Sequence, residues 1–525
     1  MNATLQSGGT DEWKPRAIPA VVFDGLFLSM LIGYLFWGMT RVPFYGDEST
    51  FVRLSKDFVY LFQDHDIQRV VYRSFSEEET KEPFTDEYLE QYNRLLTGAI
   101  NPLTIGLAWN AAGIHREELN GFWLWWSPAD TNQWKFNVAG GNMPSPRLLS
   151  IARLPSTVFT AASIIAVFII ALVLSHSRPA AWVAAFLYAT SPSVLGNGRM
   201  ALQEGSLLLF SALIVLCALS LIRLLREGTP RWRRILPGYG LLGLTSGLAL
   251  AAKHNSALII APIFLAVFIL IGSAGTGLEG RERKAAQFHL LSGLLGAGLL
   301  GLSVFYFLMP VWWIYPYNGL ALLSLSAACF GFAFPTAGRW VWIFRAASAA
   351  MVLLISLSAP RAWIGIYRSV RITAQARTDL IRAAERASGT LTTWESRLGE
   401  MADQLLFAKA EFWDVTEESQ AQIQSYEDSH LDGRKGGAVW GIVMLVLVAA
   451  GLWVALVRRR RWESLLLILW LVIPASVILL ANSLPWQRYY IILIAPWSIL
   501  AGFGVVPLSS VNVGQWVQKI RPGRG

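Results

Sequence analysis

Two adjacent acids, Asp47 and Glu48, follow directly on the first long apolar segment of the chain. A carboxylate at the point where a membrane helix leaves the bilayer can stay ionised and still experience a lowered dielectric constant. Such a group can serve as a general base that removes a proton from an attacking hydroxyl. Both acids could instead only cap a helix, because Asp is common at helix starts. The two interpretations are about equal until the rest of the sequence is considered.

Three cations stand at the ends of apolar segments that are expected on the same side of the membrane as Asp47: Arg199, Lys253 and Arg488. A single cation in such a position is most often an anchor whose charged end reaches the lipid headgroups. Lys and Arg are usually rare on this side, so three of them favour an anionic partner. A lipid-linked phosphate fits, because Arg and Lys donors bind phosphate oxygens at headgroup depth.

Other polar and aromatic residues stand beside these cations and are candidates for contacts with a substrate: Glu204, His254, Tyr489 and Tyr490. A Trp-rich segment follows the acid pair, and its side chains fit either membrane-interface anchors, the commoner case, or platforms for a sugar face: Trp123, Trp125, Trp126 and Trp134. Cys217 and Cys329 both lie in apolar runs, so the sequence has neither a disulfide framework nor a metal-ligand spacing. No cofactor is indicated, and the need for a divalent metal stays open.

The composition identifies an integral membrane protein. Hydrophobic residues make up 54% of the 525 residues, only 15% are charged, and the chain contains 23 Trp. The net charge of +9 could suggest a nucleic-acid partner, but the Lys and Arg residues fall in short loops between apolar runs. That pattern is typical of cytoplasmic loops, so a nucleic-acid partner is excluded and membrane lipids are expected instead. In a prokaryote, this multi-pass protein would lie in the plasma membrane.

The apolar runs predict an all-α fold of about twelve transmembrane helices with both termini in the cytoplasm. The first run, residues 19–39, is long enough to cross ~30 Å of hydrocarbon. It is interpreted as a retained helix, because it is too long for a signal peptide and no small-residue cleavage site precedes Arg41. Further spans are expected near residues 148–174, 180–195, 202–225, 239–252, 256–272, 289–309, 319–335, 340–359, 437–457, 463–481 and 489–507.

Two polar insertions, residues 41–147 and 361–436, are expected on the exoplasmic side. A cytoplasmic tail (1–19) then precedes an N-terminal membrane region (20–360), and the second insertion is followed by C-terminal membrane helices (437–507) and a cytoplasmic tail (508–525). Apolar periodicity predicts helices lying along the membrane surface over residues 50–62 and 371–386. The charged patch at residues 77–90 is expected to be solvated surface without a catalytic role.

The candidate residues occur in motifs that resemble, in order, those of the polytopic GT-C glycosyltransferases, a family typified by dolichyl-phosphate-mannose protein mannosyltransferases and bacterial lipid A aminoarabinose transferases. Tyr45-Gly46-Asp47-Glu48 is similar to the acid motif of the first exoplasmic loop. The other similar segments are Asn101-Pro102-Leu103 with Gly113 (a His-Pro-Pro-Leu element), residues 197–201 with Glu204 (an Arg-plus-acid motif), residues 243–253 (a Gly-Leu-Ala segment ending in Lys), and residues 488–490 with Pro496 (an Arg-Tyr-to-Pro segment).

The sequence departs from the family pattern at several points. Asn101 stands where a His is usual, and Glu204 stands where Asp is common. Residues 361–436 resemble no segment of the family.

The resemblance implies transfer of a sugar from a polyprenyl-phosphate carrier to a hydroxyl of a protein, lipid or glycan acceptor on the exoplasmic side, with inversion. Asp47 would be the general base, and Glu48 would either perturb it by like-charge repulsion or orient the acceptor. The three cations would stabilise the leaving phosphate. Tyr45 and Asn101 join the substrate-binding candidates, since they belong to the matching motifs.

Two other classes of protein remain possible. A transporter or flippase for a lipid-linked or anionic substrate would explain the spans and the buried charges, but it needs neither an interfacial acid pair nor two long insertions. The sequence also shows no matching pair of broken helices, which an inverted-repeat transporter tends to have. A scaffold subunit would explain the insertions but would leave the charges without a common purpose. Release of polyprenyl phosphate distinguishes the enzyme from both.

Overall fold

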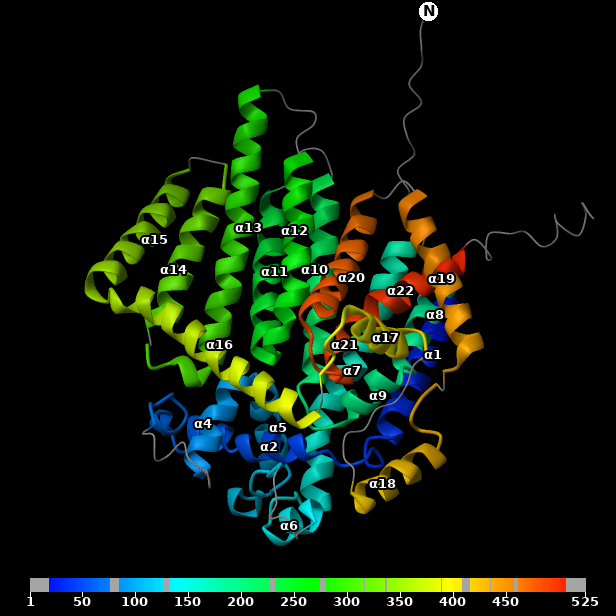
Figure 1. The fold of residues 1–525 in the computed structure, drawn as a ribbon. Coiled ribbons are helices and arrows are strands. Elements are labelled where there is room, and N and C mark those ends of the chain that lie inside the picture. Colours follow the sequence, from blue (N-terminus) through cyan, green and yellow to red (C-terminus); the bar gives the residue numbers. More distant parts are fainter. Residues whose placement is uncertain are drawn as a thin grey trace, which may run out of the picture.

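The computed structural model describes residues 18–75, 85–125, 132–226, 232–273, 280–315, 317–335, 338–388, 390–407, 416–434, 436–457 and 461–506. These residues form helices and connecting loops, with no β-strand among them (Figure 1). The predicted all-α fold class is therefore confirmed. Both predicted terminal tails lie almost entirely outside the described residues.

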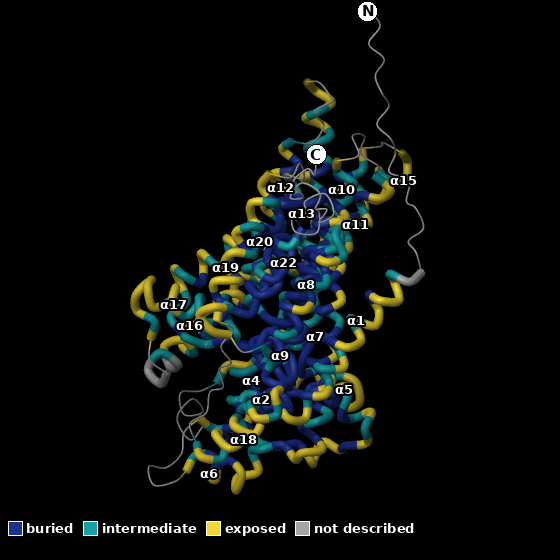
Figure 2. Tube along the Cα trace, turned by 90° about the vertical axis from the view of Figure 1, so that its right-hand side faces the viewer, coloured by how far each residue is buried: buried dark blue, intermediate teal, exposed yellow. Residues whose placement is uncertain are grey.

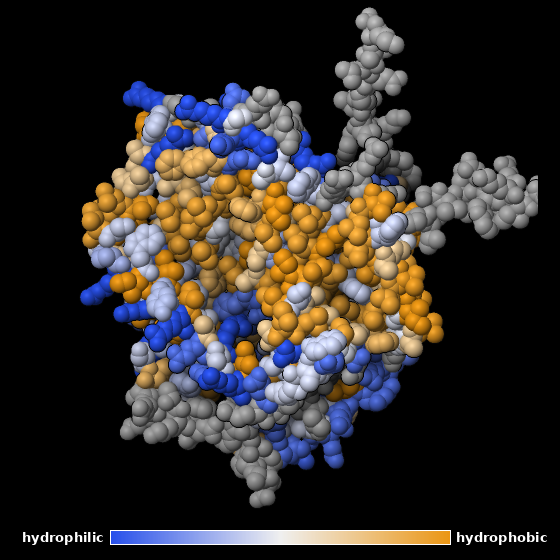
Figure 3. Space-filling model, turned by 45° about the horizontal axis from the view of Figure 1, so that its top comes forward, coloured by the Kyte–Doolittle hydropathy of each residue, from blue (hydrophilic) through white to orange (hydrophobic). Residues whose placement is uncertain are grey.

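Nine helices within these ranges are long and apolar enough to cross a bilayer. They are α1 (Ile18–Trp37), α7 (Pro146–Ser175), α10 (Glu204–Arg226), α11 (Trp232–Ala252), α12 (Ala257–Ser273), α13 (Gly280–Leu308), α15 (Arg339–Ser358), α19 (Ala438–Val457) and α20 (Arg461–Ala481). Except for α15, which is mostly exposed, their buried faces contribute to a continuous interior along the bundle (Figure 2). The outer surface carries an apolar belt between more polar ends, as expected of an integral multi-pass membrane protein (Figure 3).

Three of the predicted spans form shorter helices, so the number of twelve is not confirmed. Residues 180–195 divide into α8 (Arg178–Ala189) and α9 (Pro192–Arg199), because a proline disfavours helical geometry at the residue before it and Ser191 is extended. Residues 319–335 lie in α14 (Tyr317–Ala333), which is a short apolar helix. The last predicted span divides into α21 (Gln487–Tyr490), a 3₁₀ turn η5 (Ile491–Leu493) and α22 (Ile494–Gly504).

Small residues allow the membrane helices to approach closely. A Cβ atom at Gly243 of α11 would lie only 2.5 Å from the Ala297 carbonyl oxygen of α13. Close backbone approach of this kind is the usual way in which membrane helices pack, because lipid provides no hydrophobic drive between them. The packing holds α11 against α13, and the candidate residue Lys253 directly follows the end of α11.

The described part of the first insertion gathers at one end of the bundle (Figure 1). It contains α2 (Gly46–Leu54), α3 (Asp57–Phe62), η1 (Ile67–Arg69), α4 (Asp86–Leu96), α5 (Ile100–Ala111), η2 (Arg116–Glu118) and α6 (Gln133–Ala139). The single surface helix predicted over residues 50–62 is wrong, because α2 and α3 are separate helices. Their apolar residues Phe51 and Val59 are buried in a cluster with Trp109 of α5, so they pack against protein and not against lipid.

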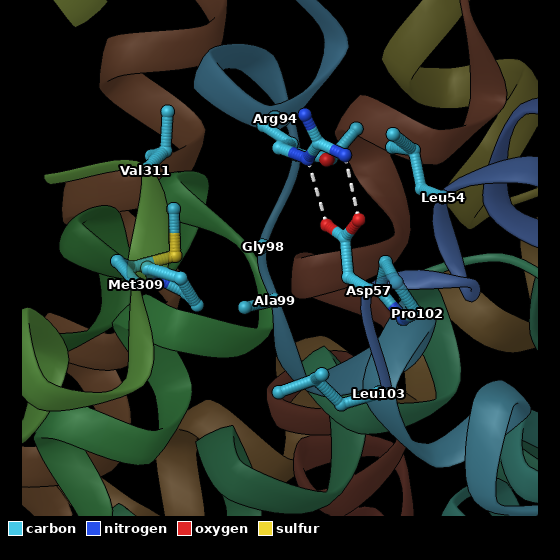
Figure 4. Close-up of a pocket in the computed structure, with 11 residues that line it drawn as sticks. Leu54, Asp57, Arg94, Gly98, Ala99, Pro102, Leu103, Met309 and Val311 are labelled. Carbon is cyan, nitrogen blue, oxygen red and sulfur yellow. Dashed lines mark hydrogen bonds and ion pairs between the residues drawn. The ribbon is translucent and has the colours of Figure 1, made fainter. Parts of the chain in front are cut away.

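The predicted solvated patch is also wrong at Glu90, whose side chain is buried. Its carboxylate forms ion pairs with Lys56 and Arg94. The Arg94 guanidinium also donates two hydrogen bonds, of 2.8 Å and 2.6 Å, to the Asp57 carboxylate. The two residues lie beside a small pocket between α3, α4 and α5 (Figure 4). These pairs fix α4 to the segment that carries the acid motif. Residues 77–84 of the patch lie outside the described residues.

The second insertion contains α16 (Arg361–Ser388), α17 (Trp394–Leu405) and α18 (Glu417–Asp428). The helix predicted over residues 371–386 lies within α16, which contacts α4 and α14. The Phe44 backbone N–H donates to Gln422 Oε1 of α18 at 3.0 Å. The two insertions are thus in direct contact, and their placement on the exoplasmic side stays a prediction.

Candidate active site

The acid predicted as the base lies in the first turn of α2. Asp47 Oδ2 accepts a hydrogen bond from Arg488 Nη1 of α21 at 2.5 Å, across 441 positions of sequence. The two side chains are 22% and 21% exposed, so a ligand can reach both. The structure therefore brings together two of the predicted site residues from opposite ends of the chain.

The neighbouring acid, Glu48, points into the protein and is fully buried. Its carboxylate receives two hydrogen bonds of 2.8 Å from Arg153 Nε and Nη2. The backbone N–H groups of Ala201 and Tyr45 also donate to it, at 2.7 Å and 3.1 Å. With both oxygens occupied and no exposed surface, Glu48 contacts neither solvent nor a ligand in this arrangement.

Arg153 was not among the residues singled out from the sequence. It lies near the start of α7, which begins after Ser145, and donates further hydrogen bonds to the carbonyl oxygens of Met39, Val42 and Pro43. An arginine inside an apolar run is itself a signal, because an ionised residue at such a position must have a partner. Arg153 and Glu48 together hold the start of α2 against α7.

A second ion pair joins Lys253, just after α11, to Glu204, the first residue of α10. Lys253 Nζ lies 2.5 Å from Glu204 Oε1, and both residues are buried. Burial lowers the pKa of Lys253, Glu204 opposes this effect, and the nearby positive charge of Arg488 lowers the pKa further. Lys253, Glu204 and Arg488 thus belong to one electrostatic neighbourhood.

Arg199, the third predicted phosphate ligand, is held elsewhere. It is fully buried. Its Nε donates to the Leu35 carbonyl at 2.8 Å, and its Nη2 donates to the Tyr34 carbonyl at 2.6 Å. Its Nη1 donates to Tyr426 Oη at 2.5 Å and to the Leu431 carbonyl. These partners join α9 to α1 and to the end of the second insertion. Arg199 therefore braces these elements, and Glu204, the acid of the same motif, pairs with Lys253.

Asn101 is fully buried in the first turn of α5, and neither polar atom of its amide has a hydrogen-bond partner within the described chain. The turn before it packs tightly against the end of α11, because a Cβ atom at Gly98 would lie 2.1 Å from the Ala252 carbonyl oxygen. The segment carrying Asn101 is therefore adjacent to the residue that precedes Lys253.

The imidazole of His254 contacts an arginine that was not predicted from the sequence. Arg377 of α16 places Nη2 3.1 Å from His254 Nδ1. The imidazole also stacks on Trp312, with ring centroids 6.5 Å apart and an interplanar angle of 17°. The only signal for Arg377 in the sequence was its position in the helical segment predicted over residues 371–386.

Aromatic rings surround the Asp47–Arg488 pair. The Arg488 guanidinium lies 4.5 Å from the Trp486 ring centroid and 6.0 Å from that of Tyr45. Trp486 stacks on Tyr489 at 5.8 Å and 16°. Tyr490 differs from Tyr45 and Tyr489, because it is fully buried and its hydroxyl accepts a hydrogen bond from Asn482.

No cluster of three or more His, Cys, Asp or Glu side chains suited to a metal ion occurs among the residues that the structure describes. The two carboxylates nearest the candidate site, Asp47 and Glu204, both pair with cations.

Residues 121–313 match the family model described as "Dolichyl-phosphate-mannose-protein mannosyltransferase". This segment includes Arg153, Glu204 and Lys253, while Asp47 and Arg488 lie outside it. The sequence matches no curated protein.

Solved structures extend the likeness over the whole chain. The archaeal oligosaccharyltransferase AglB from Archaeoglobus fulgidus, in complex with an inhibitory peptide and a dolichol-phosphate, aligns with a TM-score of 0.50 and 13% identity, covering 96% of this chain and 53% of that one. The chain has the GT-C fold. It spans about half the length of the oligosaccharyltransferase, with 53% of that chain covered.

Two further GT-C structures align less closely. The protein O-mannosyltransferase complex of S. cerevisiae bound to the sugar donor has a TM-score of 0.38 at 12% identity, covering 57% of this chain and 34% of that one. ArnT from Cupriavidus metallidurans bound to undecaprenyl phosphate has a TM-score of 0.33 at 12% identity, with 96% and 82% covered.

Proposed function

We propose that this GT-C protein is a glycosyltransferase that moves a sugar from a polyprenyl-phosphate-linked donor to a hydroxyl group of an acceptor. One observation carries the proposal: a ligand-accessible carboxylate, Asp47, is paired with Arg488 and shares its surroundings with Lys253. A candidate proton acceptor and candidate phosphate-binding cations thus lie close together, which supports the proposal. The match of residues 121–313 to a family named for a dolichyl-phosphate-sugar donor supports this assignment.

In the proposed reaction, the acceptor hydroxyl attacks the anomeric carbon while the bond from that carbon to the phosphate oxygen breaks. Asp47 takes the hydroxyl proton as the new bond forms. A single displacement inverts the anomeric configuration. The leaving polyprenyl phosphate is already a stable anion, so it requires cations and not a general acid. Lys253 and Arg488 are the cations proposed to stabilise its developing charge.

The Asp47–Arg488 ion pair implies that the donor binds before Asp47 can accept a proton in the proposed reaction. In the ligand-free chain Arg488 neutralises the carboxylate that must accept the proton. A donor phosphate competes with Asp47 for the guanidinium, and charge-assisted bonds to phosphate are strong enough to open the pair. Donor binding would thus release the base. Glu48 contributes by holding the start of α2 in place through Arg153, which is a positioning role.

The membrane face of the transfer and the class of acceptor are taken from the predictions made from the sequence. We propose that transfer takes place at the exoplasmic face, where the topology predicted from the loop charges puts Asp47 and both insertions. The donor sugar is a hexose or pentose, and the acceptor is a protein, lipid or glycan hydroxyl. The aromatic rings of Tyr45, Trp486 and Tyr489 beside the ion pair are suited to contact a sugar ring.

The proposal is tested with purified protein in liposomes that contain lipid-linked sugars extracted from the host. Mass spectrometry follows free polyprenyl phosphate and the glycosylated acceptor, and we expect the two to appear together in equal amounts. Movement of intact lipid-linked sugar across the bilayer without release of polyprenyl phosphate would contradict the proposal and indicate a flippase.

Arg488→Lys is expected to lower kcat/KM for the donor by about tenfold or more, since one charge-assisted hydrogen bond contributes ~1.5–3 kcal/mol. Lysine keeps the charge but loses the planar group that binds phosphate through two donors and lies over Trp486. Initial rates at varied donor concentration measure the effect. Arg116→Lys, in an exposed ion pair with Asp64, is the matched control. Equal kinetics for Arg488→Lys and wild type would remove Arg488 from the donor site.

A further inference from the structure

The second insertion brings a cation to the candidate site from a segment outside the motifs by which the sequence resembles the family. Arg377 of α16 donates to Asn255 Oδ1 at 3.4 Å through Nη1, and its Nη2 lies 3.1 Å from His254 Nδ1. His254 and Asn255 directly follow Lys253 in the sequence. Arg377 therefore lies against the turn that presents Lys253 to Glu204.

The partners of this guanidinium are all neutral. Besides His254 and Asn255, Arg377 donates to the Leu96 carbonyl at 3.1 Å, and its Nε is buried without a hydrogen-bond partner. Arg94 and Arg153, in contrast, each pair with a carboxylate. Arg199 lacks one as well, but each of its three nitrogens has an acceptor. Arg377 thus has a charge and a donor that the described protein leaves unsatisfied.

The surroundings of Arg377 are electropositive. Burial lowers its pKa, Tyr489 opposes this effect, and the charge of Arg488 lowers the pKa further. Both Arg377 and Arg488 also lower the pKa of Lys253. Among the described residues, two of these cations have a carboxylate partner, because Arg488 pairs with Asp47 and Lys253 pairs with Glu204. The positive charge of Arg377 is left over in a largely buried neighbourhood, which is costly without an anion to offset it.

A purely structural explanation would make Arg377 an anchor that ties α16 to the end of α4 through the Leu96 carbonyl. That role needs one hydrogen bond and no positive charge. It explains neither the unused Nε nor the position beside Lys253, where repulsion between like charges opposes the contact. An incoming anion accounts for both features.

We propose that Arg377 is the third cation of the donor-phosphate site, in the role that the sequence had suggested for Arg199. The ligand it takes is the phosphate group of a polyprenyl carrier, which is a diester in the sugar-bearing donor and a monoester in the released polyprenyl phosphate. The second insertion then takes part in donor binding through α16. This inference rests on the proposed function, since it names a residue of the same site.

The test measures binding of undecaprenyl phosphate and of undecaprenol to the purified protein in detergent. The two probes share the same chain and differ in the phosphate. We expect Arg377→Gln to weaken the affinity for undecaprenyl phosphate by about tenfold or more and to leave that for undecaprenol unchanged. Arg377→Lys is expected to recover part of the loss. Arg382→Gln, which changes an exposed arginine of the same helix, is the matched control and is expected to bind as wild type does.

A second measurement uses the wild-type protein and does not depend on the folding of any variant. Phenylglyoxal modifies arginine side chains, and mass spectrometry reports the extent at each position. Undecaprenyl phosphate is expected to protect Arg377 from modification, whereas undecaprenol is not. Modification of Arg382 is expected to be the same with both probes.

The outcomes separate this inference from the proposed function. Equal affinity of wild type and Arg377→Gln for undecaprenyl phosphate, or no protection of Arg377, would overturn the inference and leave the function standing. A parallel loss of affinity for both probes would assign Arg377 to the structural anchor. Specific phosphate binding without sugar transfer would overturn the function alone. A wild-type protein that binds both probes equally would overturn both.

Discussion

Asp47→Asn is expected to lower the rate of sugar transfer by about 10²–10⁴ and to change folding stability little. The amide cannot take the hydroxyl proton, so the attacking oxygen loses its base. Stability is kept because the Asp47–Arg488 pair is partly exposed, and such pairs contribute little. Donor binding is expected to persist or to tighten, since Arg488 no longer has to leave a carboxylate. Single-turnover rates with bound donor, together with thermal unfolding in detergent, measure both effects.

Asp64→Asn provides the matched control for this substitution. Asp64 forms a similar carboxylate–arginine pair with Arg116, but the pair lies on the exposed surface of the first insertion. Its loss is expected to leave both turnover and stability near the wild-type values. Near-normal turnover of Asp47→Asn with the natural acceptor would show that another group serves as the base.

Glu48→Gln is expected to lower the free energy of unfolding by about 3–5 kcal/mol, the range for breaking one side of a buried ion pair. The substitution leaves the Arg153 guanidinium buried without a counter-charge, and it puts an amide N–H₂ group where two donors already point. The start of α2 would then loosen from α7. Thermal unfolding of the detergent-solubilised protein is the measurement, with lowered yield of folded protein as a second readout.

Glu118→Gln is a close control, because Glu118 accepts a hydrogen bond from the His115 backbone N–H in the same way that Glu48 accepts one from Tyr45. Its surroundings are exposed, so little change in stability is expected. A Glu48→Gln protein that unfolds at the wild-type temperature while losing turnover would assign Glu48 to the chemistry and not to the scaffold.

The two substitutions together separate the roles of adjacent acids. Asp47 and Glu48 are neighbours on one helical turn, and the sequence treats them as a pair. In the structure one carboxylate faces a ligand-accessible arginine and the other is enclosed by Arg153. Side chains at successive helix positions point in directions about 100° apart, so adjacent residues need not share an environment.

The sequence by itself determined the properties that depend on local composition and spacing. Long apolar runs identified an all-α membrane protein, because each run must satisfy its own backbone hydrogen bonds within the bilayer. The position of Asp47 just after the first run, and of Lys253 and Arg488 at the ends of others, identified three residues that the structure places in one neighbourhood. A cation at the end of a membrane helix can be recognised without its partner.

The tertiary structure decided which partner each charge finds. The sequence singled out Arg199 and not Arg377, yet Arg199 braces α1 and Arg377 reaches the turn beside Lys253. The partner of Glu48 lies 105 positions away and that of Asp47 lies 441 away. Apolar periodicity predicts which face of a helix is buried. It does not predict which element packs on that face, because packing depends on contacts distant in sequence. The division of two predicted spans, residues 180–195 and 489–507, into shorter elements is likewise visible only in the structure.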